Sequence, residues 1–258
     1  MTHRSLKSYK IYPNGKIIEN EREYISEKNL EVYINKKNCY SIVCTDGYLR
    51  EMVMGRLYTE GMIRSADEVS VTFDETCSSA YVVTDNTGKQ TTELQTEEQQ
   101  AEEQQTEEPQ NEECNTKNIT EKNLKCSTLK GDVLREKIVT EAFRLAEVFN
   151  AHEGLHGITG SVHVCILSHK GSDHIFEDIS RHNTIDKAVG YALVNSIPLS
   201  ECVIFTSGRV PVDMTEKIIK AGIPVLISKS VPTAESVSLA ENAGLTLIYR
   251  AWPDSCEM

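Results

Sequence analysis

The sequence predicts an α/β fold, with a small N-terminal α+β domain followed by a C-terminal domain that has a central, mostly parallel sheet. Three observations predict it. Between residues 162 and 249, short apolar runs alternate with segments of helical periodicity, as in α/β layers. Before residue 84, strand-like runs surround one helical segment. A stretch almost without apolar residues separates these parts of the 258-residue chain, so we expect domains at 1–84 and 132–258 with an insert at 85–131.

The N-terminal domain is expected to contain one helix and four strands. Leu49, Met52 and Val53 share a face that Leu57 continues, and Gly61 follows where a helix would end. This pattern predicts a helix over residues 48–59. The strands are expected at 30–34, 40–43, 68–73 and 80–83.

The insert concentrates the negative charge of the chain. Residues 91–113 are nearly all Thr, Glu and Gln, so they cannot bury enough apolar surface to offset the entropy of ordering, and we expect them to be disordered. The formal net charge of −12 argues against a nucleic-acid-binding surface. Because much of that charge lies in the insert, a locally basic anion pocket elsewhere remains compatible with it.

The C-terminal domain is expected to begin with an amphipathic helix at residues 133–150, where Leu134, Ile138, Leu145 and Phe149 recur at helical spacing. Further strands are expected at 162–167, 175–179, 202–205, 224–227 and 245–249, and further helices at 184–194, 212–221 and 233–243. In α/β sheets, ligands bind beyond the carboxyl ends of the strands.

The densest polar cluster, at residues 176–190, lies at one such strand end. Asn183 is expected to cap the following helix, with Arg181 and His182 just before its N-terminus, where free N–H groups and the helix dipole attract phosphate. A capped helix with a solvated charged face would explain the same segment without a ligand.

Three further polar turns fall near strand ends. Residues 206–209 offer two hydroxyls, Gly208 and Arg209, residues 228–233 contain Lys229, and residues 159–163 read Thr-Gly-Ser-Val-His. Each turn alone is common. Together they predict a pocket for a phosphorylated, nucleotide-like ligand.

None of the eight cysteines forms a C-x-x-C pair, which disfavours zinc-ribbon and thioredoxin-like sites. Four lie in or beside strand-like runs and are expected to be buried: Cys39, Cys44, Cys165 and Cys202. Cys114 and Cys126 flank a polar stretch where a thiol would be exposed and reactive.

The blocks at residues 177–187, 206–209, 222–225, 232–233 and 245–248, with Cys44 and the segment 51–63, resemble the formate dehydrogenase accessory sulfurtransferase family (FdhD/NarQ). The resemblance covers nearly the whole chain outside the insert. It implies a cytidine-deaminase-like C-terminal fold, usually dimeric, that binds the molybdenum or tungsten bis(molybdopterin guanine dinucleotide) cofactor as a substrate, without a structural metal. It also implies transfer of persulfide sulfur from a cysteine desulfurase to that cofactor, which activates formate dehydrogenase.

The binding blocks of the family fall on these positions of the chain: Thr159, Gly160, His163, Arg181, His182, Asn183, Asp186, Lys187, Ser207, Gly208 and Arg209. Ser180 stands where the family usually has Gly. We expect Arg181, Lys187 and Arg209 to hold phosphate groups. The sequence argues against deamination, because His163-Val-Cys165 lacks the required Glu and no P-C-x-x-C follows.

Sulfur transfer needs an accessible thiolate, which the family usually provides in a Ser-Cys-Gly-x-Cys-Gly-like loop that this chain lacks. Cys126 is the first candidate, because the surrounding lysines 122, 125 and 130 would stabilise a thiolate. Cys114 follows two glutamates, so it is a second choice or a resolving partner. The alternatives are a non-catalytic cofactor-binding chaperone and a regulatory nucleotide sensor. Trp252, the only Trp, could stack on a pterin or guanine or could simply pack.

Overall fold

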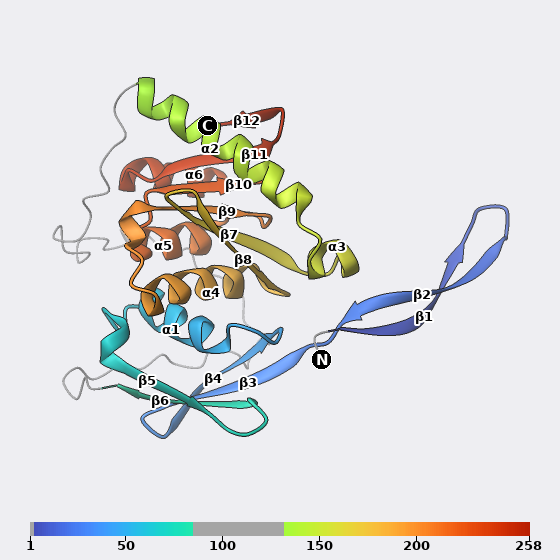
Figure 1. Cartoon of the computed structure of the whole chain (residues 1–258), viewed down its shortest axis with the longest axis horizontal. Coiled ribbons are helices and arrows are strands. Elements are labelled where there is room, and N and C mark those ends of the chain that lie inside the picture. Colours follow the sequence, from blue (N-terminus) through green and yellow to red (C-terminus); the bar gives the residue numbers. More distant parts are fainter. Residues whose placement is uncertain (1–2, 85–131) are drawn as a thin grey trace, which may run out of the picture.

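The computed structural model describes residues 3–84 and 132–258 (Figure 1), and for residues 132–134 it describes the backbone alone. The acidic insert lies outside the described residues, and so do Cys114 and Cys126. Within the described parts, no helix combines the length and the apolar character needed to cross a membrane.

A six-stranded mixed sheet forms the centre of the C-terminal part, in the order β12-β11-β10-β9-β7-β8. Its strands are β7 (His163–His169), β8 (Ser172–Asp178), β9 (Cys202–Thr206), β10 (Val225–Ser228), β11 (Thr246–Trp252) and β12 (Ser255–Glu257). Helix α2 (Asp132–Ala151) covers one face, and the other face carries α4 (Arg181–Val194), α5 (Val212–Ala221) and α6 (Ala234–Ala243) (Figure 1). Every strand and helix predicted between residues 133 and 249 is present.

The prediction of a mostly parallel sheet is wrong. Only the β9–β10 and β10–β11 pairs are parallel, whereas β7 runs antiparallel to both β8 and β9, and β12 runs antiparallel to β11. For β7, the cause is its two-residue connection to β8, in which Lys170 and Gly171 both have positive φ. A connection this short can join only antiparallel strands, and positive φ at both positions is typical of hairpin turns.

The N-terminal part contains the expected helix and four strands. The strands are β3 (Lys28–Ile34), β4 (Lys37–Cys44), β5 (Val69–Phe73) and β6 (Ser79–Thr84), which form a sheet of order β4-β3-β6-β5. Helix α1 (Leu49–Thr59) packs on one face of this sheet through the buried side chains of Met52, Val53 and Leu57. Burial of such side chains is the main force holding this part together.

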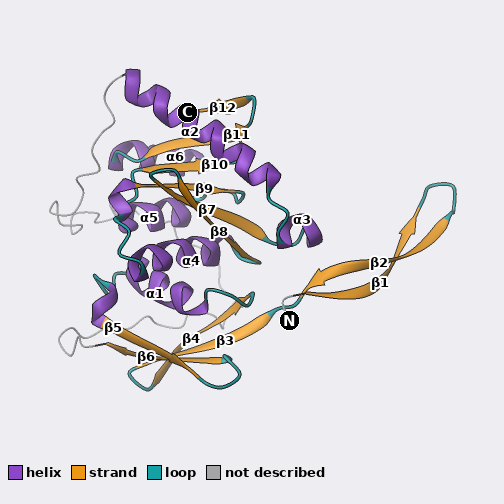
Figure 2. Cartoon of the chain, in the orientation of Figure 1, coloured by secondary structure: helices purple, strands orange, loops and turns teal. Residues whose placement is uncertain are grey.

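Helices α1 and α4 cross in contact and join the two parts of the fold (Figure 2). Gly55 on α1 and Gly190 on α4 lie at the crossing. A methyl group on Gly55 would overlap the carbonyl oxygen of Asp186, and one on Gly190 would overlap that of Glu51. Because both residues are glycines, the backbones of α1 and α4 come into direct contact. This contact packs the N-terminal part closely against the C-terminal part.

An antiparallel hairpin, β1 (His3–Ile11) with β2 (Ile17–Ile25), projects from the body (Figure 2) and was not predicted. Its strands carry charged residues on both faces, and Ile11 and Ile17 at its far end are 70% and 62% exposed. No apolar alternation marks such strands, because neither face packs on a core. The usable signal was the turn, where Pro13-Asn-Gly15 separates two isoleucine-containing runs.

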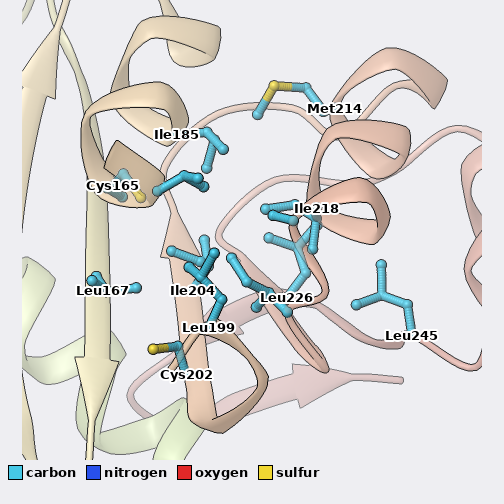
Figure 3. Packing of buried hydrophobic residues seen from close by; sticks show 14 of the residues in the cluster. Cys165, Leu167, Ile185, Leu199, Cys202, Ile204, Met214, Ile218, Leu226 and Leu245 are labelled. Carbon is cyan, nitrogen blue, oxygen red and sulfur yellow. The ribbon is translucent and has the colours of Figure 1, made fainter. Parts of the chain in front are cut away.

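The prediction of buried cysteines is confirmed at three of its four positions. Cys165 and Cys202 lie in the core beside Leu167 and Ile204 (Figure 3), and Cys44 is buried in the N-terminal core. The prediction is wrong for Cys39, which is exposed. Cys39 occupies the position on β4 that alternates outward from buried Ile42 and Cys44, so its neighbours in sequence did not decide its side of the sheet.

Candidate functional site

The carboxyl ends of β8, β9, β10 and β11 meet at one edge of the central sheet, together with the beginning of β7. A cavity of about 450 Å³ lies at this edge. Among the predicted site residues, Gly160, His163 and Ser207 line it. The sequence analysis had singled out Lys229 as a cation and Trp252 as a stacking candidate, and both also lie in the wall. The expected location of the site is thus where the structure has its cavity.

Lys229 lies on the aromatic side of the cavity. Its Nζ is 4.5 Å from the ring centroid of Phe149 and 4.5 Å from that of Trp252. Burial lowers the pKa of this ammonium. Its backbone is fixed, because its N–H donates to the carbonyl oxygen of Thr206 at 3.0 Å. Lys229 therefore offers a cation held mainly by ring faces, which suits an anionic ligand.

Two histidines also line the cavity, and the ring centroid of His156 lies 5.3 Å from that of Phe149. The Nδ1 of His156 is 2.6 Å from the carbonyl oxygen of Val162, which fixes the ring. With Nδ1 donating to that carbonyl, Nε2 is the acceptor of the neutral ring. His163 has a lowered pKa, first because it is partly buried and then because Arg181, His156 and Arg209 bring positive charge close to it. The site is therefore electropositive and holds His163 in the neutral form.

Glu177 holds the short helix α3 (Leu155–Thr159) that carries His156. Its carboxylate accepts the backbone N–H of Leu155 at 2.9 Å and that of His156 at 2.7 Å. The imidazole Nε2 of His152 lies 3.2 Å from the same carboxylate, but without the geometry of a hydrogen bond. Glu177 thus acts as the N-terminal anchor of the wall formed by α3.

The Ser207-Gly-Arg209 turn faces the start of α4. The hydroxyl of Ser207 accepts the N–H of Val164 at 2.9 Å, which ties the turn to β7. A methyl group on Gly208 would lie 2.9 Å from the Cβ of Arg181, so only a glycine lets Arg181 lie against this turn. Arg209 is exposed at the rim.

Arg181 has a buried Nε with no hydrogen-bond partner among the described residues. Buried donors of this kind are normally satisfied, so an unpaired guanidinium N–H is a group that a ligand oxygen would satisfy. His182 is partly exposed and donates or accepts at 2.8 Å with Asp213, beside the same helix start. The structure thus brings Arg181 into the neighbourhood of the cavity and places His182 at its outer side.

Thr159 and Gly160 shape the loop between α3 and β7. The buried Thr159 hydroxyl donates to the carbonyl oxygen of Leu155 at 2.8 Å and accepts the N–H of Ser161 at 3.2 Å. Gly160 ends α3 with a φ of 66°. Thr159 therefore holds the loop from inside, while Gly160 and Ser161 face the cavity.

The prediction that Asn183 caps α4 is wrong. The N-cap is Ser180, and Asn183 is buried in the first turn of the helix. Its Nδ2 donates to the carbonyl oxygen of Val43 at 2.9 Å and to Asp178 Oδ1 at 2.8 Å. Asn183 thus connects α4 to β4 and to the end of β8, and no part of it lines the cavity.

Asp186 and Lys187 are also buried in the interior, so the expectation that Lys187 binds a phosphate group directly is not met. Lys187 Nζ lies 2.7 Å from Asp178 and donates to Thr45 Oγ1 at 3.1 Å. Asp186 pairs with Lys217 at 2.7 Å and accepts from Thr59 at 3.2 Å. Both side chains bind partners in α1, α5 or the β4–α1 connection and stabilise the contact between the two parts.

Sequence reasoning missed five lining residues: Phe149, His156, Ser161, Val162 and Ser230. Phe149 was assigned to the core face of α2, and indeed it packs on Phe205 while its other side borders the cavity. His152 and His156 have the H-E-x-x-H spacing of a zinc site. However, α2 ends at Ala151, and the described residues contain no group of His, Cys, Asp and Glu that could hold a metal ion.

A second depression, of about 590 Å³, lies at the base of the hairpin. It is lined by polar residues, and Lys28 and Asp46 form an ion pair of 2.8 Å in its wall. None of the predicted site residues contributes to it. We therefore assign the site to the cavity at the strand ends.

Comparison with known proteins identifies the family of this chain. The model of the FdhD/NarQ family matches residues 25–258. The sulfur carrier protein FdhD of Halalkalibacterium halodurans is 31% identical over 234 residues, covering 89% of this chain and 83% of the relative. That of Sulfurisphaera tokodaii is 31% identical over 255 residues, covering 96% and 93%.

A crystal structure described as a formate dehydrogenase accessory protein of Desulfotalea psychrophila shares the fold. Its TM-score is 0.73 at 22% identity, and the match covers 100% of this chain and 96% of that one. The similarity of fold extends to both sheets, and the sequence match leaves out little more than the projecting hairpin. The chain belongs to the FdhD/NarQ family.

Proposed function

We propose that this protein is a sulfurtransferase that carries persulfide sulfur from a cysteine desulfurase to the molybdenum or tungsten bis(molybdopterin guanine dinucleotide) cofactor of formate dehydrogenase. Family membership supports the proposal, since relatives over most of the chain are named sulfur carrier proteins. The observation that carries it is the electropositive cavity at the strand ends, with Lys229, His156 and Trp252 in its wall.

The cavity has the groups that a guanine dinucleotide requires. Phosphates need cations and N–H donors, which Lys229 and the unpaired Nε of Arg181 supply. A planar base needs an aromatic face, which Trp252 supplies at 43% exposure. Ser161, Ser207 and Ser230 add hydroxyls for the polar edges of the ligand.

The sulfur step requires a thiolate. The thiolate of the carrier attacks the outer sulfur of the desulfurase persulfide, a new S–S bond forms while the original one breaks, and the desulfurase cysteine leaves as a thiolate. In the second step the S–S bond of the carrier persulfide breaks and the carrier cysteine leaves as a thiolate. The outer sulfur would pass to the cofactor, whose reduced metal would supply the two electrons that turn this sulfur into a sulfide ligand. Cys126, with Cys114 as second choice, remains the predicted carrier, and both lie outside the described residues.

The described cysteines are poorer carriers. Burial raises the pKa of Cys44 to about 12 and that of Cys202 to about 11, so neither ionises near neutral pH. Cys165 is fully buried, and its pKa is raised for the same reason. Cys39 is the described cysteine that is classed as exposed, and its thiol donates to the carbonyl oxygen of Lys37. It therefore serves as the matched control for the experiment below.

A second candidate is a non-catalytic chaperone that binds the cofactor without carrying sulfur. It is favoured by the absence of C-x-x-C from the sequence. A homodimer and a cytidine-deaminase-like relationship of the C-terminal part belong to the proposal as the family resemblance implies them. A cytoplasmic location also belongs to it, because no apolar stretch of the sequence is long enough to span a bilayer. Formate dehydrogenase is the expected recipient.

Mass spectrometry after incubation with a cysteine desulfurase and cysteine separates the two functions. We expect the native chain and Cys39→Ala to gain the mass of one sulfur, and Cys126→Ala to gain none. Loss of the gain in Cys114→Ala alone would make Cys114 the carrier. If the native chain gains no sulfur at all, the chaperone function replaces the carrier function.

A further inference from the structure

Lys229 covers the aromatic faces of the cavity. Its ammonium lies over the ring of Phe149 and over the ring of Trp252, at 4.5 Å from each centroid. Stacked aromatic rings have centroids about 4.5–7 Å apart. The ammonium therefore occupies space over these rings that a stacked ligand ring would need. A planar ligand cannot stack on the covered face of either ring while Lys229 stays in place.

The backbone around Lys229 is held in place. Ser230 donates its hydroxyl to the carbonyl oxygen of Ser207 at 3.1 Å, and its N–H to the hydroxyl of Ser228 at 3.0 Å. Ser228 in turn donates to the carbonyl oxygen of Gly208 at 3.0 Å. These bonds connect the turn after β10 with the turn after β9. Any movement of Lys229 is therefore a movement of its side chain.

Among the described residues, no carboxylate pairs with the ammonium of Lys229, whereas the lysines at 217 and 187 are both paired. Lys229 is also partly desolvated, so a phosphate oxygen would be a better partner than the ring faces. An arriving phosphate can thus draw the ammonium away from the rings.

We propose that Lys229 is a displaceable cover that makes stacking of the ligand base conditional on its phosphate groups. The phosphate pairs with the ammonium of Lys229, so the Lys229 side chain moves off the face of Trp252. The base of the ligand then stacks on that face. The ligand class is a planar heterocyclic base that carries phosphates. This proposal deepens the proposed function, from which it takes that class of ligand.

The proposal predicts unequal effects on two ligands. A nucleoside has to displace Lys229 without compensation, whereas a nucleotide replaces the cation–ring contact with a cation–phosphate contact. We expect the native chain to bind GDP at least tenfold more tightly than guanosine. In Lys229→Met this preference should shrink by on the order of tenfold, because GDP loses its cation while guanosine gains an open ring face.

Equilibrium dialysis with GDP and guanosine measures both affinities, and the emission of Trp252 reports the ring directly because the chain has one Trp. Pyrophosphate alone should also change that emission, since it draws the ammonium away. Lys220→Met is the matched control, because Lys220 is exposed on α5 and its only ion-pair partner among the described residues is Glu216. Lys229→Gln, with circular dichroism of every variant, separates binding from folding.

Two results would contradict the proposal that Lys229 covers the aromatic rings. One is a loss of guanosine affinity in Lys229→Met and Lys229→Gln that is as large as the loss of GDP affinity. The other is GDP binding that leaves Trp252 emission unchanged. Sulfur loading by mass spectrometry keeps the two proposals apart. If persulfide forms but neither GDP nor guanosine binds, the cover is refuted and the carrier function stands. If both ligands behave as expected and no persulfide forms, the carrier function fails alone.

Discussion

Lys187 and Asp178 form an ion pair of 2.7 Å in which the side chains are 1% and 0% exposed. The lysine comes from α4 and the aspartate from the end of β8, and Thr45 from the N-terminal part binds both of them. The pair therefore lies at the meeting point of the two parts of the fold. Its charges are fully desolvated, so each depends on the other.

Removing one partner of this ion pair should lower the stability of the folded protein. We expect Lys187→Met to lower the free energy of unfolding by about 3–5 kcal/mol, because it leaves Asp178 charged and buried. Urea denaturation followed by circular dichroism measures the loss. Lys220→Met, which removes an exposed lysine, should stay within about 0.5 kcal/mol of the native chain. Equal stability of the two variants would show that the pair does not support the fold.

The contact between α1 and α4 should be sensitive to a single methyl group. Gly190→Ala places its Cβ onto the carbonyl oxygen of Glu51, and we expect a loss of about 1–3 kcal/mol or more. Gly157→Ala is the control, since its Cβ would be 3.5 Å from the nearest atom, an ordinary contact. Thermal unfolding of both variants tests this. A native melting temperature for Gly190→Ala would contradict the close approach.

Gly208→Ala should impair binding rather than folding. Its Cβ would lie 2.9 Å from the Cβ of Arg181 and push that side chain aside. If Arg181 contacts a phosphate, both Gly208→Ala and Arg181→Ala should weaken GDP binding by about 1.5–3 kcal/mol, the value of a charged hydrogen bond. Calorimetric titration gives the affinities. The assignment fails if Arg181→Ala binds GDP as the native chain does.

His163 should make the fold less stable in acid. Its pKa in the folded chain lies below the ordinary value of 6.5, so the unfolded chain takes up a proton first as the pH falls. Stability contributed by neutral His163 is complete above pH 6.5 and declines as the pH falls through 6.5 towards the lowered value. Urea titrations between about pH 8 and pH 5 should therefore show a smaller decline for His163→Gln than for the native chain. An identical decline would remove His163 as a contributor.

The helices and strands with a buried face were predictable, because burial imposes periodicity. The segment 212–221 was predicted as a helix over the residues that form α5. The hairpin β1–β2 was not, since neither of its faces is buried and its strands show no alternation. The direction of β7 was missed because Lys170 adopts a positive φ, which is uncommon for residues other than glycine and is not indicated by its residue type.

For the site, the polar turns marked the edge of the sheet where the cavity lies, but not which side chains face that cavity. His163 and Ser207 line the cavity. In contrast, the side chains of Asn183, Asp186 and Lys187, from the polar cluster at residues 176–190, are buried in the interior. Charged residues are mostly exposed, so a sequence pattern predicts them at the surface. A buried ion pair can be recognised only when the oppositely charged partner, distant in the sequence, is known. Asp178 and Lys217 are those partners, and their pairing depends on tertiary structure.

The reversed direction of β7 also determines the shape of the cavity. In a purely parallel sheet, every strand brings its carboxyl end to the binding edge, and the segments leading into the strands stay on the far side. Because β7 runs the other way, the chain that leads into it crosses this edge, and with it come α3, Ser161 and His163. One inverted strand thus gives the ligand an additional wall, and an insertion between α2 and β7 would alter recognition directly.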